Sequence, residues 1–208
     1  MVGDYYGDWN YFQNTGTASA PVFGAAQVNP FGLTATYMFA TPAIVDLDND
    51  GDKDIISTEA YSNFQYFMNT GTASAPVFGS PTQNPFGLNA VNLFGFPSFG
   101  DLDNDGDKDL LVGEVGGNFK YFKNNGTASA PAFGAAQTNT FGLTALGTAT
   151  NSVAAPTFID MDGDGDLDVM ATDANGDFYY FANTGTASAP AFATSVMNPF
   201  SLTAVNGY

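Results

Sequence analysis

The string NTGTASAP occurs at residues 14–21, 69–76 and 183–190, and a fourth copy, NNGTASAP, lies at 124–131. Successive copies begin 55, 55 and 59 residues apart. Self-similarity at a nearly fixed period is typical of proteins built from repeated structural units. The repeat therefore decides the architecture, and the other motifs are read within it.

Two further markers keep this spacing. FGL begins at residues 31, 86 and 141, and FSL takes its place at 200. The acidic stretch DLDNDGDKD occurs at 46–54 and 101–109, with DMDGDGDLD at 160–168. The chain thus holds four copies of the aromatic half of the repeat and three copies of the acidic loop.

One unit reads as four short strands: PAIVDL before the acidic loop, DIISTE after it, then NFQYFMN, and PVFG as the outer strand. In the third strand Phe64 and Tyr66 alternate with Phe67, so both of its faces are apolar. A strand of this kind is buried between neighbouring sheets. Repeated four-stranded units of roughly 50 residues are typical of β-propellers. A β-solenoid is the alternative, but its coils are usually much shorter.

We therefore predict an all-β fold, a four-unit β-propeller with about 55 residues per blade, in one domain over residues 1–208. The expected units are 1–40, 41–95, 96–150 and 151–208. Met1 aligns with Ile56, inside the second strand, so the first blade lacks its innermost strand and its acidic loop. The tail TAVNGY stops before another PAIV-like strand. We expect an open edge, in a fragment of a longer array or in a subunit completed by a neighbour's strand.

The amino-acid composition excludes or disfavours several classes of function. A hydrophobic content of 44% argues against disorder despite a net charge of −17. The four basic residues make binding to nucleic acid or to an anionic membrane unfavourable. No apolar run is long enough to cross a bilayer, and a secretion signal is absent or removed. The chain has no histidine and no cysteine, which removes the usual general base and thiol chemistry.

The acidic loop has the spacing D-x-D-x-D-G-x-x-D. Alternating carboxylates, a glycine for the sharp turn, the seventh-position carbonyl and a closing aspartate provide an all-oxygen shell suited to Ca²⁺, whereas Mg²⁺ demands a smaller octahedral shell. A solvated turn without metal is the other interpretation, but carboxylates about 5 Å apart repel by roughly 3 kcal/mol at an effective dielectric constant of about 20. The predicted metal residues are Asp46, Asp48, Asp50, Asp52 and Asp54 in the first loop, Asp101, Asp103, Asp105, Asp107 and Asp109 in the second, and Asp160, Asp162, Asp164, Asp166 and Asp168 in the third.

An acidic loop between two strands, followed by an aromatic strand and N-T-G, resembles the FG-GAP/VCBS repeats of integrin α-chain propellers, secreted bacterial surface proteins and a fungal propeller lectin. The resemblance implies a calcium-braced propeller used in adhesion, assembly or glycan binding, and it carries no catalytic residues. Members commonly have seven blades, so a four-unit chain departs from the family pattern. Since weak Ca²⁺ sites fill only at millimolar Ca²⁺, we expect an extracellular or cell-surface location.

Fifteen of the 21 acidic residues lie in the loops. Four others share one repeat position at the end of the second strand, away from the loops, beside several aromatic residues. We expect them to form a rim for a sugar or protein partner; the alternative is that they bond the amides of the following turn. The rim residues are Asp4, Glu59, Glu114, Asp173, Tyr5, Tyr6, Trp9 and Tyr61.

Three functions remain open at this point. The first is a secreted Ca²⁺-stabilised module for adhesion or self-assembly, which the near-identical repeats favour. The second is a lectin-like glycan binder with several equivalent weak sites. The third, a paired-carboxylate glycosidase, is disfavoured because the acids recur symmetrically, whereas catalysis needs unlike residues in unlike environments. We therefore predict that the protein is not an enzyme.

Overall fold

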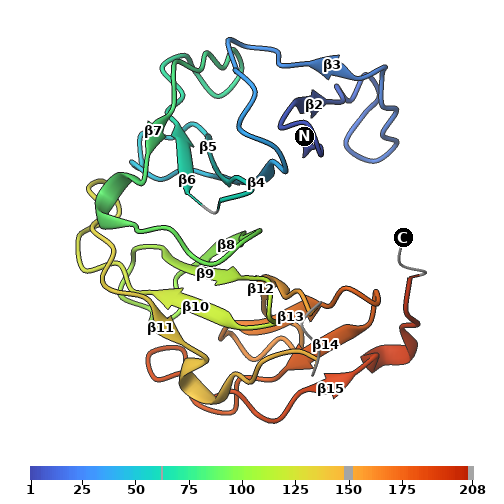
Figure 1. Cartoon of the computed structure of the whole chain (residues 1–208), viewed down its shortest axis with the longest axis vertical. Helices are drawn as coiled ribbons and strands as arrows, with labels where there is room; N and C mark the ends of the chain where they lie inside the picture. Colours follow the sequence, from blue (N-terminus) through green and yellow to red (C-terminus); the bar gives the residue numbers. More distant parts are fainter. Residues whose placement is uncertain (62, 148–151, 206–208) are drawn as a thin grey trace.

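The computed structural model describes residues 1–61, 63–147 and 152–205. Its strands form four antiparallel sheets that follow one another along the chain (Figure 1). The first sheet has three strands and each of the others has four. The prediction of an all-β, four-unit propeller with an incomplete first blade is confirmed.

Each blade is a simple meander in chain order, because consecutive strands pair as neighbours. The first contains β1 (Val2–Gly3), β2 (Trp9–Tyr11) and β3 (Gln27–Val28). The second contains β4 (Thr41–Val45), β5 (Asp54–Thr58), β6 (Phe64–Phe67) and β7 (Thr82–Gln83). The third contains β8 (Phe96–Gly100), β9 (Asp109–Gly113), β10 (Phe119–Phe122) and β11 (Gln137–Thr138). The fourth contains β12 (Ala155–Ile159), β13 (Asp168–Thr172), β14 (Phe178–Phe181) and β15 (Val196–Met197).

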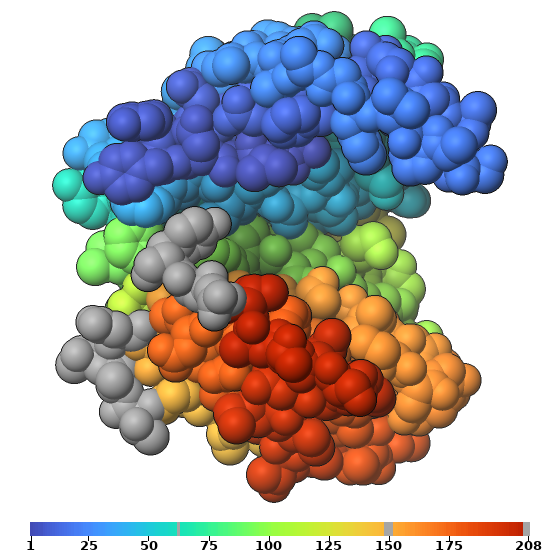
Figure 2. Space-filling model, turned by 90° about the vertical axis from the view of Figure 1, so that its right-hand side faces the viewer, coloured from blue at the N-terminus to red at the C-terminus, as the bar shows by residue number. Residues whose placement is uncertain are grey.

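The blades are arranged in an open ring. The innermost strands β4, β8 and β12 pack against one another, and β1 packs against β4. Figure 1 shows the first and fourth blades at the two ends of an arc. In the space-filling view the surface is hollowed between these two blades (Figure 2).

The core is divided among three junctions between blades. Trp9, Ile55 and Phe67 belong to the cluster between the first and second blades. Separate clusters around Phe64 and Phe119 fill the second-to-third and third-to-fourth junctions. Phe64 and Tyr66 thus face one junction and Phe67 the other, so the expected burial of both faces of the third strand is confirmed.

The outer strand differs from the prediction. PVFG does not form it: Phe78 makes a single bridge to Asn69, and β7 at Thr82–Gln83 pairs with β6 instead. The reason lies in Asn69, whose Oδ1 accepts hydrogen bonds from the backbone N–H groups of Gly71 and Val77, at 3.0 and 2.9 Å. These bonds fold the NTGTASAP segment into a compact loop, and pairing resumes only beyond it.

The FGL marker forms a tight turn at each junction. After β11 comes the 3₁₀ turn η2 (Thr140–Gly142), with Phe141 at φ 57° and Gly142 at φ 94°. Equivalent turns are η1 (Pro85–Gly87) and η3 (Pro199–Ser201). The backbone N–H of Phe192 in the fourth blade donates to the carbonyl of Phe141 at 2.7 Å. The turn therefore binds the next blade directly through the backbone.

The C-terminal tail does not complete the first blade within the described residues. The backbone N–H of Val205 donates to the carbonyl of Gly176 at 3.1 Å, which holds the tail on the fourth blade. The end of the TAVNGY segment, residues 206–208, lies outside the described residues. The inner edge of β1 is left without a strand partner among the residues that the structure covers.

Candidate metal centres

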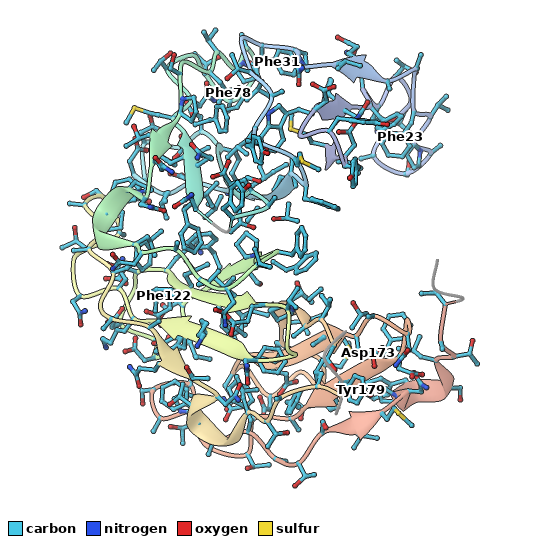
Figure 3. All side chains as sticks on the ribbon, in the orientation of Figure 1. Phe23, Phe31, Phe78, Phe122, Asp173 and Tyr179 are labelled. Atoms are coloured by element: carbon cyan, nitrogen blue, oxygen red, sulfur yellow. The ribbon has the colours of Figure 1, made fainter. Side chains whose placement is uncertain are left out.

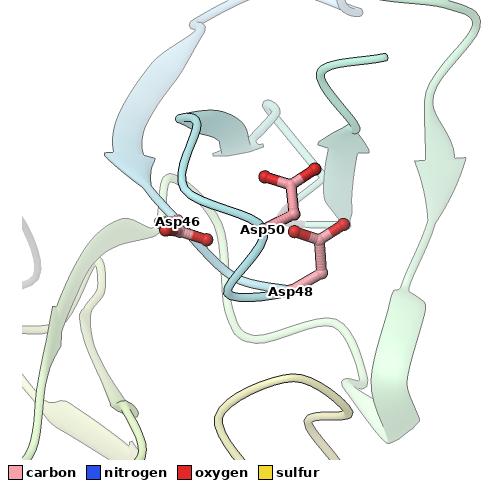
Figure 4. Close-up of side chains that lie close together, drawn as sticks. All are labelled: Asp46, Asp48 and Asp50. Carbon is pink, nitrogen blue, oxygen red and sulfur yellow. The ribbon is translucent and has the colours of Figure 1, made fainter. Parts of the chain in front are cut away.

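Each acidic loop joins the two innermost strands of a blade, between β4 and β5, β8 and β9, and β12 and β13. Its first three alternating aspartates bring one carboxylate oxygen each within 4.8 Å of one another. Figure 4 shows this for Asp46, Asp48 and Asp50. Gly51 adopts φ 96°, which allows the sharp turn that places the three carboxylates together.

Several of these carboxylate oxygens are buried and have no hydrogen-bond partner among the described residues. They are Oδ1 of Asp46, Asp48, Asp52, Asp103, Asp107 and Asp166. A buried acceptor without a donor is costly, and for a charged oxygen a bound cation supplies the missing partner. The donor set is oxygen only, so the residues fit a hard cation such as Ca²⁺.

The seventh loop position was predicted to act through its carbonyl. Its carboxylate is a further candidate ligand, because Asp52, Asp107 and Asp166 are at most 9% exposed and each has one buried oxygen without a hydrogen-bond partner among the described residues. The sequence pattern gave no reason to separate this side chain from the exposed aspartates. Only its burial identifies it.

The closing aspartate has a second role. In the second blade, Oδ2 of Asp54 accepts the Tyr66 hydroxyl at 2.9 Å and the Leu47 N–H at 3.2 Å. Oδ1 accepts the N–H of Asn69 at 2.8 Å, which leaves one lone pair on Oδ1 for an ion. Asp54 is 1% exposed, so it ties the loop, the third strand and the NTG turn together inside the blade.

The same three bonds recur in the third and fourth blades. Asp109 accepts Tyr121, Leu102 and Asn124, and Asp168 accepts Tyr180, Met161 and Asn183. This explains why the acidic loop and the NTG turn recur with a fixed spacing, since each loop is held by the turn of its own blade.

Acidification is expected to stabilise the metal-free protein. Burial raises the pKa of Asp109 to about 6. Burial, followed by neighbouring carboxylates, also raises the pKa values of Asp52, Asp107 and Asp166. A folded-state pKa above the unfolded value of 3.8 means that the folded chain binds more protons, so stability is gained as pH falls through about 6 and the gain is complete below about 4.

Thermal melts in excess chelator should thus give a higher Tm at about pH 5 than at about pH 7. With Ca²⁺ present, protons compete with the ion and the gain should shrink or reverse. A chelated protein that loses stability steadily on acidification from neutral pH would contradict the assigned direction of these pKa shifts.

The second loop contains a cation of its own. Lys123 forms an ion pair with Asp103, and its Nζ lies 3.5 Å from Oδ2 of Asp105. The hydrogen bond to Asp103, together with both carboxylates, raises the pKa of Lys123. The repeat places Met68 and Ala182 at this position in the second and fourth blades. This contact was not predicted from the sequence, although a single lysine among equivalent residues indicates a local difference.

The predicted acidic rim is only partly present. Glu59 and Glu114 are buried, at 7% and 0% exposure, and bond within the protein: Asn63 Nδ2 donates to Glu59 at 2.9 Å, and the amide N–H and side chain of Asn92 donate to Glu114 at 3.0 and 2.9 Å. Two of the four acids are therefore unavailable as a surface for a partner.

Asp4 and Asp173 bind the amides of the turn that follows them, which was the alternative interpretation. Asp4 Oδ1 accepts the N–H groups of Tyr6 and Asp8, both at 2.9 Å. Asp173 accepts the equivalent N–H groups of Asn175 and Asp177 and also the Tyr179 hydroxyl, beside it in Figure 3. The position at the end of the second strand is thus chiefly a turn-forming position.

Trp9 does not lie on a rim. It is 0% exposed, its ring meets Phe67 edge to face with the centroids 5.4 Å apart, and its Nε1 donates to the Thr34 carbonyl at 2.9 Å. The placement of Trp9 beside a ligand was wrong, because Trp9 occupies the repeat position of Phe64, whose burial the strand pattern indicated.

Tyrosines do gather on the surface at this end of the first two blades. Tyr5, Tyr6 and Tyr61 are 53%, 75% and 62% exposed. Tyr61 stacks on Tyr37 with the ring centroids 5.3 Å apart and 13° between their planes. We call Tyr5, Tyr6, Tyr37 and Tyr61 the tyrosine surface.

Comparison with known proteins agrees with this architecture. The family model described as an FG-GAP-like repeat matches residues 46–112 and 101–171. No curated protein matches the chain, and no solved structure matches it. Within the described residues no helix is long and apolar enough to cross a membrane. Repeats of this family are typically extracellular structural or binding modules. The two matches cover more than half of the chain, and each runs from one acidic loop to just beyond the next. The chain therefore belongs to the FG-GAP-like repeat family.

Proposed function

We propose that this protein is a secreted, Ca²⁺-stabilised β-propeller module for extracellular adhesion or self-assembly. Three acidic loops each bind one Ca²⁺ through the first three alternating aspartates, the seventh residue and the closing aspartate. The ions stabilise the blades and perform no chemistry, because a loop with this many protein oxygens leaves little room for a substrate.

The observation that carries this proposal is the set of buried carboxylate oxygens without partners in all three loops. The net charge of −17 adds to it, since the folded chain concentrates its acids where only a cation relieves their repulsion. An extracellular location follows from the expected affinity, because loops with a Kd of about 0.1–1 mM fill at extracellular Ca²⁺ and stay empty in the cytosol.

Removal of Ca²⁺ should destabilise the folded protein. At about 1 mM free Ca²⁺ each site contributes roughly 0.4–1.4 kcal/mol, so three sites contribute roughly 1–4 kcal/mol. For a chain of this size the melting temperature should fall by roughly 3–15 °C on chelation. Thermal melts in Ca²⁺ and in excess chelator, together with calorimetric titration for three sites, measure the effect.

Two variants separate metal binding from general charge effects. Asp48→Asn removes a loop carboxylate with an unpartnered oxygen and should lower the stoichiometry to two ions. Asp8→Asn removes one charge outside the loops at a position where the repeat already carries Asn63 and Asn118, and it should leave all three sites intact. An equal melting temperature with and without Ca²⁺ would refute the proposed bracing role.

The second loop should bind Ca²⁺ more weakly than the other two, because Lys123 must leave Asp103 and Asp105 before the ion enters. Lys123→Met copies the residue of the second blade and should raise the affinity of this site by about three- to tenfold. The same change should lower stability in chelator, where the ammonium is the loop's counter-ion. Site-resolved Ca²⁺ titration by NMR measures the affinity, and urea unfolding in chelator measures the stability. Lys120→Met is the control for affinity alone, because Lys120 lies 3.6 Å from the buried carboxylate of Glu114 and its loss should itself lower stability.

Glycan binding is the second candidate, and the tyrosine surface favours it. Stacked, exposed tyrosine rings suit the C–H faces of sugars, and their hydroxyls suit sugar hydroxyl groups. A glycan array followed by NMR titration would test it: a true site shifts the signals of Tyr37 and Tyr61. Unchanged tyrosine signals in the presence of every glycan would exclude glycan binding at this surface, and the adhesion or assembly module would be the one remaining candidate function.

A further inference from the structure

The first blade has no acidic loop, but it retains the two hydrogen-bond donors that bind such a loop in the other blades. In the other three blades the closing aspartate binds a tyrosine hydroxyl and the N–H of the NTG asparagine, at 2.7–2.9 Å. Tyr11 and Asn14 occupy these two positions in the first blade. Among the described residues neither the Tyr11 hydroxyl nor the Asn14 N–H has a hydrogen-bond partner.

A cavity of ≈ 370 Å³ lies where the missing strand and loop would pack. Met1, Tyr11 and Phe31 line it from the first blade, and Ile44 and Ile55 from the second. Phe31 and Phe78 lie together at this junction (Figure 3). At the next junction the equivalent space is filled by Leu47 of the acidic loop, which is 3% exposed and packs in the core cluster. Ile44 is left 51% exposed.

The charge of the cavity fits an acidic segment. Lys53 lines it, and the equivalent Lys108 lines the corresponding space at the next junction together with Asp46 and Leu47. Lys108 thus lies beside the acidic loop of the preceding blade, whereas Lys53 at the first junction has no such loop beside it. The fourth blade carries Leu167 at this position. The inner edge of β1 also offers backbone groups for pairing, as β5 does to β4.

We propose that the first blade binds, from a second chain, an apolar strand followed by a D-x-D-x-D-G-x-x-D loop. The incoming strand pairs with β1 as β4 pairs with β5. Its closing aspartate accepts hydrogen bonds from the Tyr11 hydroxyl and the Asn14 N–H, and its apolar loop residue fills the cavity. The inference rests on the proposed assembly function and names the partner segment and the residues that recognise it.

The test is a titration of the whole protein, in Ca²⁺, with a fluorescent peptide that copies residues 41–55, TPAIVDLDNDGDKDI. We expect saturable binding, with protection from hydrogen exchange appearing at Gly3, whose N–H faces the inner edge of β1, whereas the Val2 N–H faces β2. Tyr11→Phe removes one donor to a carboxylate and should weaken binding by about tenfold. Tyr121→Phe is the matched control, because it removes the same hydroxyl from a filled blade and should leave peptide affinity unchanged.

A second peptide tests the other partner of the contact. Replacing the closing aspartate of the peptide with asparagine should weaken binding to the unmodified protein and have a smaller effect on Tyr11→Phe. Equal affinity of both peptides, or of TPAIV alone, would overturn the inference, because it would indicate a groove that accepts any apolar strand.

Failure of this inference and failure of the proposed function are distinguishable in the same samples. Ca²⁺-dependent melting without peptide binding up to about 1 mM would overturn the binding site and leave the calcium-braced module standing. Peptide binding to a protein whose melting temperature does not depend on Ca²⁺ would support the binding site and overturn the calcium-braced module. Exchange protection at β12 instead of β1 would also overturn the proposal.

Discussion

Asp54→Ala should cost the folded protein roughly 3–5 kcal/mol, a large share of the usual stability of a single domain. The change removes the acceptor for three buried donors at once: the Tyr66 hydroxyl and the N–H groups of Leu47 and Asn69. The Asp54 side chain is 1% exposed, so the three donors lose their acceptor at a site with little access to water. Urea unfolding in excess chelator measures the loss without any contribution from bound metal.

The matched control is Asp50→Ala in the same loop. Asp50 is exposed and accepts a hydrogen bond from the Asp52 N–H at 3.0 Å. In chelator it should cost under about 1 kcal/mol, whereas in Ca²⁺ both variants should lose the ion. Equal and small losses for the two variants in chelator would show that the closing aspartate does not hold the blade together.

Gly142→Ala should destabilise the junction between the third and fourth blades by roughly 2–4 kcal/mol. A Cβ at this position would lie 2.4 Å from the carbonyl oxygen of Phe192 in the next blade, and φ is 94°. The clash involves backbone, so relief requires the third and fourth blades to separate and the hydrogen bond from Phe192 to Phe141 to lengthen. Chemical unfolding measures the cost.

The repeat supplies a graded series of controls. At Gly87 the same Cβ would lie 3.0 Å from the Phe133 carbonyl, so Gly87→Ala should cost less. In the fourth blade Ser201 already occupies this position, and Ser201→Ala should be nearly neutral. A cost that is the same at Gly142 and Gly87 would mean that left-handed backbone strain, and not the approach of the next blade, decides it.

The fold could be predicted from the sequence because the same strand and turn signals occur in each of the four repeat units. The period, the turn residues and the two apolar faces of the third strand each indicated the same stacked sheets, and the three acidic loops fixed where each inner hairpin turns. The missing strand of the first blade followed from alignment of Met1 with Ile56 alone. Local signals and the repeat agreed at these positions, so little tertiary information was needed.

Two predictions were wrong, the position of the outer strand and the placement of Trp9. For the outer strand, a side chain and a backbone group compete for the same hydrogen-bond partners. PVFG has the composition of a strand, but Asn69 caps the preceding turn and delays pairing until Thr82. Trp9 was assigned by its neighbours in sequence, although its repeat position indicated the core. The hydrogen bonds from Tyr66 and Asn69 to Asp54 could also have been predicted. All three residues recur together in three units, and the first unit lacks the equivalent of Asp54 alone.

A core divided among three junctions has a consequence for how the molecule opens. Each sheet is stabilised by its immediate neighbours, so the free energy of unfolding behaves as a sum over junctions and not as one cooperative total. The first blade has a single junction, a cavity within it and no acidic loop, and it is therefore the segment that detaches at the lowest cost. Amide exchange should rise steeply toward β1 while the strands around Phe119 stay protected to the limit of global unfolding. The first blade should therefore unfold locally while the other three blades remain folded, and this partly unfolded form should be sampled under native conditions.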